Sequence, residues 1–147
     1  MTMRVTSRWA AAGLLVGGLV LSGCSDTAEA ESELPSPAKV EAIAGSQLSR
    51  LTLEARAIER VGIKTEPAKD SGAQGRKVVP YAAVIYDATG GTWVYTNPEP
   101  RVYLRQAIKV ETIAAGQAIL SAGPAAGTAV VTVGAAELYG TELGVDH

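Results

Sequence analysis

Two alternating runs of β-forming residues, separated by a short turn, constrain the fold of this chain more than any other feature. Residues 92–97 (TWVYTN) and 101–110 (RVYLRQAIKV) are rich in Val, Thr, Tyr and Trp, and the segment between them is Pro-Glu-Pro. Such runs on either side of a turn predict two antiparallel strands joined as a β-hairpin. We interpret Trp93 and Tyr95 as core anchors of this hairpin rather than as a surface that stacks a ligand.

The register of the hairpin is predicted by the separation of apolar from basic side chains. We expect Thr96 to pair with Arg101. Trp93 then lies opposite Leu104 on an apolar face, and a slip by one residue would turn the arginines into the core. The other face carries a basic strip that consists of Arg101, Tyr103, Arg105 and Lys109. The simpler interpretation of this strip is a solvated sheet face, but because Arg and Tyr are enriched in protein interfaces, it is also a candidate surface for docking a partner.

The rest of the chain from residue 48 onward also favours short elements. Further strands are expected at 48–53, 63–68, 78–85, 113–120 and 129–133. Residues 54–61 are helix formers and end at Gly62, which predicts one short helix. Residues 135–139 are expected to form at most one helical turn before Gly140. The expected fold class is therefore mainly β: a small domain over residues 48–147, built as a twisted sheet or a partly open barrel with one short helix.

The N-terminal residues carry the pattern of an export leader. Arg4 and Arg8 form a positive start, and residues 9–20 contain no charge. An apolar run of about 12 residues is shorter than the roughly 20 that a helix needs to cross a bilayer. The quartet Leu21-Ser22-Gly23-Cys24 resembles the lipobox of bacterial lipoproteins, which implies cleavage between Gly23 and Cys24 and lipid attachment to Cys24. The alternative is a cleaved secretory signal, residues 1–23, followed by an incidental free thiol.

Cleavage would leave a lipid-anchored tether in front of the β-domain. Residues 25–37 are acidic and polar with only Leu34 to bury, which favours a flexible chain. Residues 39–47 fit either more tether or a first short strand, and we place the tether over residues 24–47. Two or more acyl chains, at ~0.8 kcal/mol per buried methylene, hold a protein firmly on a membrane. We therefore expect the protein on the extracytoplasmic face of the cell membrane, anchored by lipid.

The residue types that remain after cleavage argue against several kinds of site. The only histidine is His147 at the end of the chain and the only cysteine is Cys24, so imidazole-dependent triads and thiolate zinc sites are not expected. No phosphate-binding glycine motif occurs. Without Arg4 and Arg8 the formal net charge falls from −2 to −4, which argues against a nucleic-acid partner. We expect neither an enzyme nor a cofactor other than the lipid, although a Ser/Lys or paired-carboxylate enzyme and a carboxylate cation site stay open.

Several segments resemble the periplasmic adaptor, or membrane fusion protein, family of efflux transporters. The upstream segment is 53–67, which ends in VGIKTEP. The middle segments are 79–87 (VPYAAVIYD), 91–95 (GTWVY) and 102–110. The last segment, 121–135, is similar to the closing GL-x-x-G-x-x-VV-x-x-GA pattern of that family. In full adaptors these two ends meet in a membrane-proximal domain. Here only residues 69–78 separate them, and neither a lipoyl motif nor heptads for a helical hairpin are present. The resemblance therefore implies a free-standing membrane-proximal β-domain.

The resemblance also implies a function. It implies a non-catalytic accessory subunit that docks on the extracytoplasmic face of an integral membrane transporter. Full adaptors reach toward an outer-membrane channel with their helical hairpin, and because this chain has no such hairpin, that reach is not implied. A second hypothesis is an extracytoplasmic binding module for a small ligand or a cell-wall component. A ligand module should have a concave pocket with a few polar groups, whereas an adaptor should have a flat or edge-strand docking surface. The oligomeric state is left open by the sequence.

Overall fold

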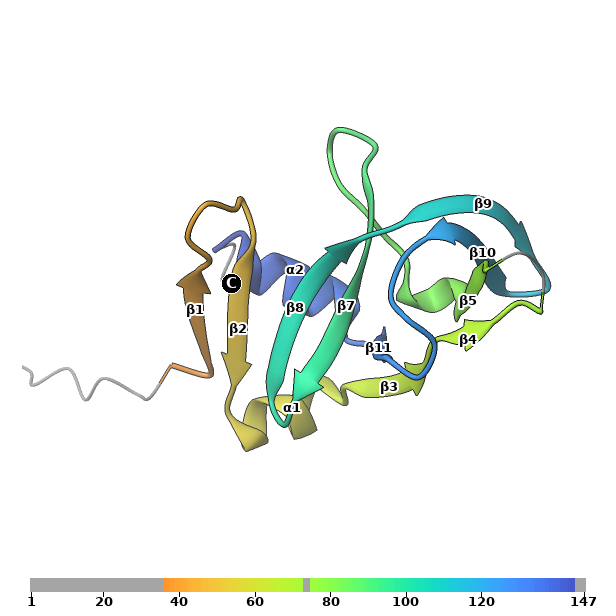
Figure 1. Cartoon of the computed structure of the whole chain (residues 1–147). Helices are drawn as coiled ribbons and strands as arrows, with labels where there is room; N and C mark the ends of the chain where they lie inside the picture. Colours follow the sequence, from red (N-terminus) through yellow and green to blue (C-terminus); the bar gives the residue numbers. More distant parts are fainter. Residues whose placement is uncertain (1–35, 73–74, 145–147) are drawn as a thin grey trace, which may run out of the picture. The chain divides into compact units, whose positions relative to one another are not determined.

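The computed structural model of the chain describes residues 36–72 and 75–144, and this part contains two antiparallel β-sheets and two α-helices (Figure 1). The predicted fold class, a small mainly β domain, is confirmed. The predicted leader, the cleavage site between Gly23 and Cys24, most of the tether and His147 lie outside the described residues. Among the described residues, no helix is long and apolar enough to cross a membrane.

The first sheet has seven strands and the second has four, and every pair within them is antiparallel. The first sheet has the order β1-β2-β8-β7-β11-β3, with β6 also on β7, and consists of β1 (Ala38–Ala42), β2 (Ser49–Leu53), β3 (Lys64–Pro67), β6 (Ile85–Tyr86), β7 (Thr92–Glu99), β8 (Val102–Ala107) and β11 (Ala129–Val133). The second has the order β4 (Lys69–Asp70), β5 (Lys77–Pro80), β10 (Gln117–Ala122) and β9 (Lys109–Ala114). The helices are α1 (Ala55–Val61), α2 (Ala135–Glu142) and the short 3-10 helix η1 (Tyr81–Ala83).

Two bends carry the chain directly from one sheet to the other. A single residue, Ala68, separates β3 from β4, and Ile108 separates β8 from β9. Both residues are buried. The Ile108 N–H donates to the Thr92 carbonyl at 2.9 Å, and the Ala68 N–H donates to the Thr128 carbonyl at 2.8 Å. The peptide groups at the bends therefore keep hydrogen-bond partners, as buried backbone requires.

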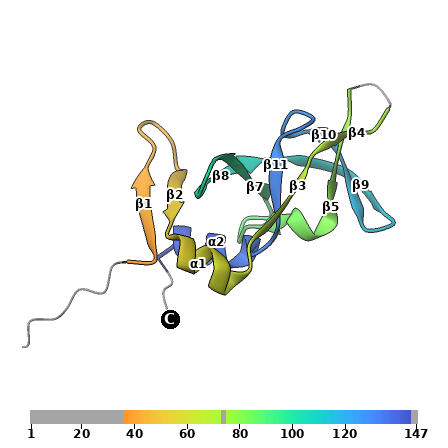
Figure 2. The same ribbon diagram turned by 90° about the horizontal axis from the view of Figure 1, so that it is seen from below.

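The central strands of the first sheet are buried on both faces. Val94 of β7 packs in a cluster with Leu120 of the second sheet. The next residue, Tyr95, points to the opposite face and packs in a second cluster with Leu138 of α2. Figure 2 shows α1 and α2 on the same side of this sheet. The central strands β7 and β11 thus lie between the helices on one face and the four-stranded sheet on the other.

Helix α1 confirms the prediction of a short helix that ends at a glycine. Gly62 has a φ of 70°, and its N–H donates to the Ile58 carbonyl at 2.9 Å. This left-handed conformation is the common helix C-cap and favours glycine, because a side chain is strained there. The strand predicted at 129–133 is also confirmed, as β11.

The folded domain begins earlier than the predicted boundary at residue 48. Residues 38–42 form β1 and pair with β2, with Val40 opposite Leu51. The predicted tether over 24–47 is therefore too long at its C-terminal end. An edge strand needs little apolar sequence, because much of it stays in water, and Val40 itself is 44% exposed. The composition of this segment could not distinguish such a strand from a tether.

Other predicted elements are wrong in extent. The strand expected at 101–110 breaks at Ile108 into β8 and β9, and the one expected at 78–85 is interrupted by η1. The strand expected at 113–120 is two strands, β9 and β10, joined by a turn at Ala115 and Gly116, which both have positive φ. Helix α2 runs through Gly140 to its eighth residue, where only one turn was expected. Leu138 of α2 is buried against the sheet. Packing of an apolar helix face outweighs the low helix propensity of one glycine.

Candidate functional site

The four residues predicted to form one basic docking strip lie in different environments, so that prediction is wrong. Arg101 occupies the turn between β7 and β8, with a φ of 65° and its guanidinium 3.8 Å from the Glu54 carboxylate. Tyr103 is buried in the core. Arg105 is largely buried, with 10% of its side chain exposed. Lys109 is exposed, but it lies on β9 of the other sheet.

The cause is a hairpin register that differs from the predicted one by an odd number of residues. Trp93 lies opposite Ala107 instead of Leu104, three residues further along the chain. Because side chains alternate between the faces of a strand, an odd shift exchanges the two faces. Arg105 therefore lies opposite Tyr95 and faces the core. The prediction that Tyr95 is a core anchor is confirmed, since it is fully buried.

Arg105 belongs to a buried polar cluster that joins the sheet to α2. Its Nε lies 3.1 Å from Oε2 of Glu142, and the glutamate side chain is only 3% exposed. The same carboxylate accepts a hydrogen bond from the Tyr95 hydroxyl and another, at 3.2 Å, from the Ser49 N–H. The Arg105 Nε–H has no hydrogen-bond partner, so this group holds Glu142 by charge rather than by an aligned hydrogen bond.

Two aromatic rings complete this cluster. The guanidinium carbon of Arg105 lies 4.5 Å from the centre of the Trp93 ring and 5.3 Å from that of Tyr139, within the range of cation–π attraction. Burial, assisted by the hydrogen bond to Glu142, raises the pKa of Tyr95. The charges of the cluster are paired with each other away from solvent. We therefore infer that the cluster fixes the position of α2 on the sheet.

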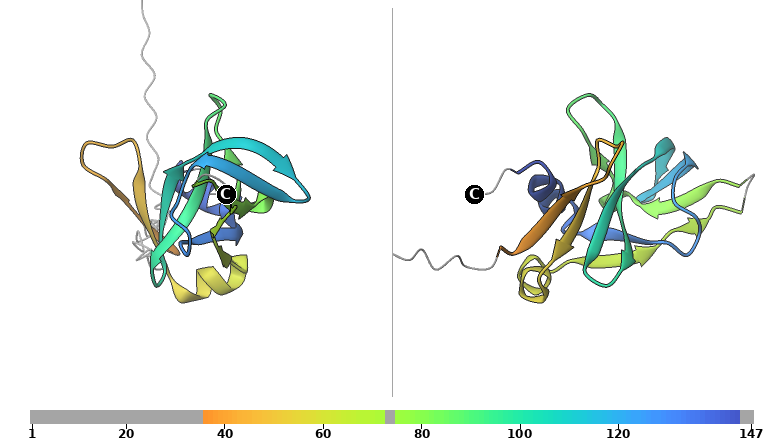
Figure 3. Two further views of the ribbon diagram at one scale, coloured as in Figure 1. Left: turned by 45° about the vertical axis from the view of Figure 1, so that its right-hand side comes forward. Right: turned by 60° about the vertical axis from the view of Figure 1, so that its left-hand side comes forward.

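Asp87 organises the loop of residues 87–91, the green loop that extends past the strands in both views of Figure 3. Its Oδ1 accepts hydrogen bonds from the N–H groups of Thr89 and Gly91 and from the Thr89 hydroxyl, each at 2.8 Å. Its Oδ2 accepts a hydrogen bond from the Trp93 indole at 2.7 Å. These hydrogen bonds, led by that of the Thr89 side chain, lower the pKa of Asp87 to about 2. The loop is thereby fixed to the ring that covers the buried arginine.

Beside this loop lies a pair of exposed tyrosines, which we name the tyrosine patch: Tyr81 on η1 and Tyr86 at the end of β6. Their exposed fractions are 42% and 50%. A hydrogen bond with the Tyr81 side chain is the main cause that raises the pKa of Tyr86, so the two side chains are neighbours. The sequence did not predict the patch. In the single strand predicted at 78–85 and continued to Tyr86, residues 81 and 86 would lie on opposite faces, and the turn of η1 brings them together.

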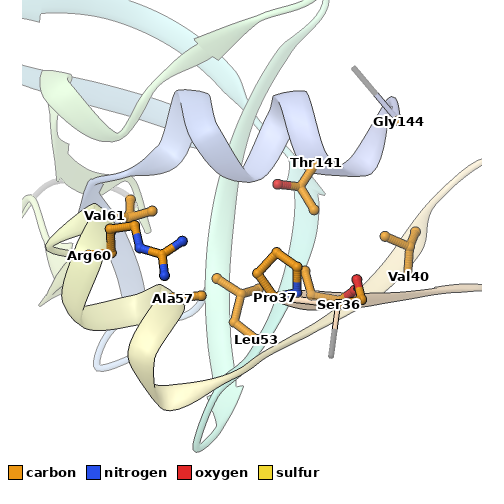
Figure 4. Close-up of a pocket in the computed structure, with 10 residues that line it drawn as sticks. Ser36, Pro37, Val40, Leu53, Ala57, Arg60, Val61, Thr141 and Gly144 are labelled. Atoms are coloured by element: carbon orange, nitrogen blue, oxygen red, sulfur yellow. The ribbon is translucent and has the colours of Figure 1, made fainter. Parts of the chain in front are cut away.

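The described part of the chain offers one further feature that a ligand could use. A cavity of about 370 Å³ lies between α1, α2 and the start of β1 (Figure 4). No group of three His, Cys, Asp or Glu side chains within residues 36–72 and 75–144 could hold a metal ion. The candidates for function on geometry are therefore the tyrosine patch and this cavity.

Comparison of the chain with protein-family models, with curated proteins and with solved structures found no match. The resemblance to periplasmic adaptors stays a prediction from residues 53–67, 79–87, 91–95, 102–110 and 121–135.

Proposed function

We propose that the chain is a lipid-anchored extracytoplasmic protein that serves as a non-catalytic accessory subunit of an efflux transporter. The lipobox pattern that ends at Cys24 and the resemblance of the folded part to adaptors support this assignment. Lipid on Cys24 keeps the domain at the membrane surface, where a membrane transporter is within reach. The acidic, polar residues before β1 allow the domain to search for its partner.

The observation that carries the proposal is the pairing of the two segments that resemble the ends of an adaptor. β3 belongs to the upstream segment and β11 to the closing segment, and the two strands pair antiparallel with Thr65 opposite Val131. Full adaptors bring their two ends together in the membrane-proximal domain. The same meeting of the ends in this chain supports a free-standing domain of that kind.

We assign the contact with the transporter to the tyrosine patch. Tyrosine side chains supply large contact areas and are enriched among the residues that carry binding energy in interfaces. Tyr86 directly precedes Asp87, whose hydrogen bonds hold the adjoining loop in one conformation. A surface that is ordered before binding loses less conformational entropy when the partner docks. The assigned contact is therefore small but preorganised.

Photocrosslinking in intact cells tests this proposal. A photoreactive phenylalanine analogue replaces Tyr86 in one variant and Val133 in a control variant, since Val133 is 43% exposed on β11 and lies outside the patch. We expect the label at position 86 to crosslink to an integral membrane transport protein and the label at position 133 not to do so. Adding Tyr81→Ser should weaken the crosslink, and Cys24→Ser should remove it by releasing the protein from the membrane.

Two results contradict the proposal. The first is a label at position 86 that reaches no membrane transport protein while the protein is still bound to the membrane. The second is a crosslink of equal yield from position 133, because this would mean that membrane attachment alone, and not the tyrosine patch, brings the two proteins together.

A further inference from the structure

The cavity between the two helices has mostly apolar walls. Pro37 and Val40 line it from β1 and the residues before it, Leu53 from the end of β2, and Ala57 and Val61 from α1. Its volume of about 370 Å³ lies at the lower end of the ~300–1,000 Å³ of typical small-molecule sites. A ligand with one alkyl chain of moderate length fits this space, whereas a lipid with two long chains does not.

One charged side chain reaches into this apolar space. Figure 4 shows Arg60, in the last turn of α1, with its guanidinium directed toward Thr141 on α2. It is the only charged side chain among the described residues that line the cavity. The Thr141 hydroxyl is already engaged, since it donates to the Glu137 carbonyl at 2.9 Å. Arg60 is therefore the group that would set the orientation of a ligand.

Most arginines in the described part of the chain form an ion pair, and Arg60 does not. Four others are each ion-paired with a glutamate: Arg50 with Glu99, Arg76 with Glu111, Arg101 with Glu54 and Arg105 with Glu142. Within residues 36–72 and 75–144, Arg60 makes no ion pair and no hydrogen bond through its side chain. Arg60 is exposed, so water reaches its guanidinium, which carries five N–H donors. A carboxylate in the cavity would replace water on two of them.

We propose that this cavity binds a single-chain fatty carboxylate, with the alkyl chain along the apolar walls and the carboxylate against Arg60. Charge complementarity identifies the head group, because the planar guanidinium matches a carboxylate with two parallel hydrogen bonds. The apolar walls identify the chain, because burial of methylene groups is the main gain available there. The site shares no residue with the tyrosine patch and does not depend on the transporter contact.

Calorimetric titration of the full chain carrying Cys24→Ser, which removes the only thiol and the expected lipid, provides the test. The probes are octanoate, decanoate and decanol at concentrations below micelle formation. Each additional buried methylene strengthens binding about fourfold, the equivalent of ~0.8 kcal/mol. We expect decanoate to bind up to about sixteenfold more tightly than octanoate if both extra methylenes are buried. Decanol should bind more weakly than decanoate, because it cannot pair with Arg60.

Three variants locate the binding. Arg60→Gln should weaken decanoate binding about tenfold, the low end for loss of a charge-assisted hydrogen bond, and leave decanol binding unchanged. Arg56→Gln is the matched control, because Arg56 lies on the same helix but does not line the cavity. Val40→Trp should block both ligands from the rim, since Val40 is 44% exposed and the larger ring need not enter the core. Circular dichroism establishes that each variant is folded.

The proposal is overturned if decanoate does not bind, or if Arg60→Gln and Arg56→Gln bind it equally well. It is also overturned if decanoate and decanol bind with the same affinity, because the carboxylate would then contribute nothing. Crosslinking from Tyr86 is a separate measurement, so failure of the ligand site and failure of the transporter contact are distinguishable.

Discussion

Replacing Glu142 with leucine should cost the domain about 3–5 kcal/mol of its free energy of unfolding. Removing one partner of a buried ion pair typically costs ~3–5 kcal/mol, because the other charge is left buried without compensation. Arg105 and Glu142 meet this condition, with side chains that are 10% and 3% exposed. The Tyr95 hydroxyl and the Ser49 N–H lose their acceptor in the same variant, so the upper half of the range is expected.

The double variant Arg105→Met/Glu142→Leu should recover much of this loss. Replacement of a buried ion pair by apolar side chains of similar volume is often neutral or stabilising. The unpaired Tyr95 hydroxyl should keep a residual cost of ~1–3 kcal/mol, which Tyr95→Phe in the same background should remove. Urea unfolding followed by the fluorescence of Trp93 measures these differences, and this ring reports directly because it lies on the Arg105 guanidinium.

An exposed ion pair of the same sheet provides the control. Arg50 and Glu99 lie 2.9 Å apart with side chains that are 37% and 59% exposed, so Glu99→Gln should cost at most about 1 kcal/mol. A cost of Glu142→Leu as small as that of Glu99→Gln would refute the reasoning. So would costs of Arg105→Met and Glu142→Leu that simply add in the double variant, because strictly additive costs mean that the two residues do not interact.

Three further predictions follow from individual groups. Burial raises the pKa of Tyr95, whereas a phenol in the unfolded chain ionises at about 10. The free energy of unfolding, measured by urea titration, should therefore fall as the pH rises above that value. Tyrosinate absorbance should detect Tyr95 as the last tyrosine to ionise. Hydrogen bonds lower the pKa of Asp87 from 3.8 to about 2. The contribution of Asp87 to the order of the 87–91 loop should therefore be complete above pH 3.8 and lost as the pH falls toward 2. Amide NMR signals of the loop should show this pH dependence in the unchanged protein and lose it in Asp87→Asn. Gly134 has a φ of 90°, and a Cβ there would lie 2.8 Å from Cγ1 of Ile63. Gly134→Ala should therefore destabilise the domain by about 1–3 kcal/mol or more in the same urea assay. An unchanged unfolding midpoint would contradict this.

Elements whose limits depend on local chemistry were predictable from the sequence. The helix formers of α1 end at Gly62 because the left-handed C-cap conformation favours glycine. The β-branched run of 129–133 became β11 with the predicted limits. The hairpin of β7 and β8 was predictable as a hairpin, because both of its runs are β-formers and the turn between them is rich in proline.

The candidate sites were not predictable, because each is built by residues from separate elements. The tyrosine patch exists because η1 interrupts the expected strand and brings residues 81 and 86 to one surface. The cavity is lined by Pro37, Ala57 and Thr141, which belong to distant parts of the chain. None of these residues carries a local pattern that distinguishes it from an ordinary surface or core position.

The hairpin register was likewise decided by contacts between distant residues and not by the local sequence pattern. The prediction placed the arginines in water, because a buried charge without a partner is costly. Arg105 is buried nevertheless, since Glu142 on α2 supplies the opposite charge and Trp93 and Tyr139 flank the guanidinium. That partner lies far along the chain, on a helix that local propensity alone would have ended at Gly140. The sequence by itself thus determined α1, β11 and the existence of the hairpin, through local propensity. Contacts between distant residues decided which face of each strand is buried, and they also decided the limits of elements such as β1 and α2.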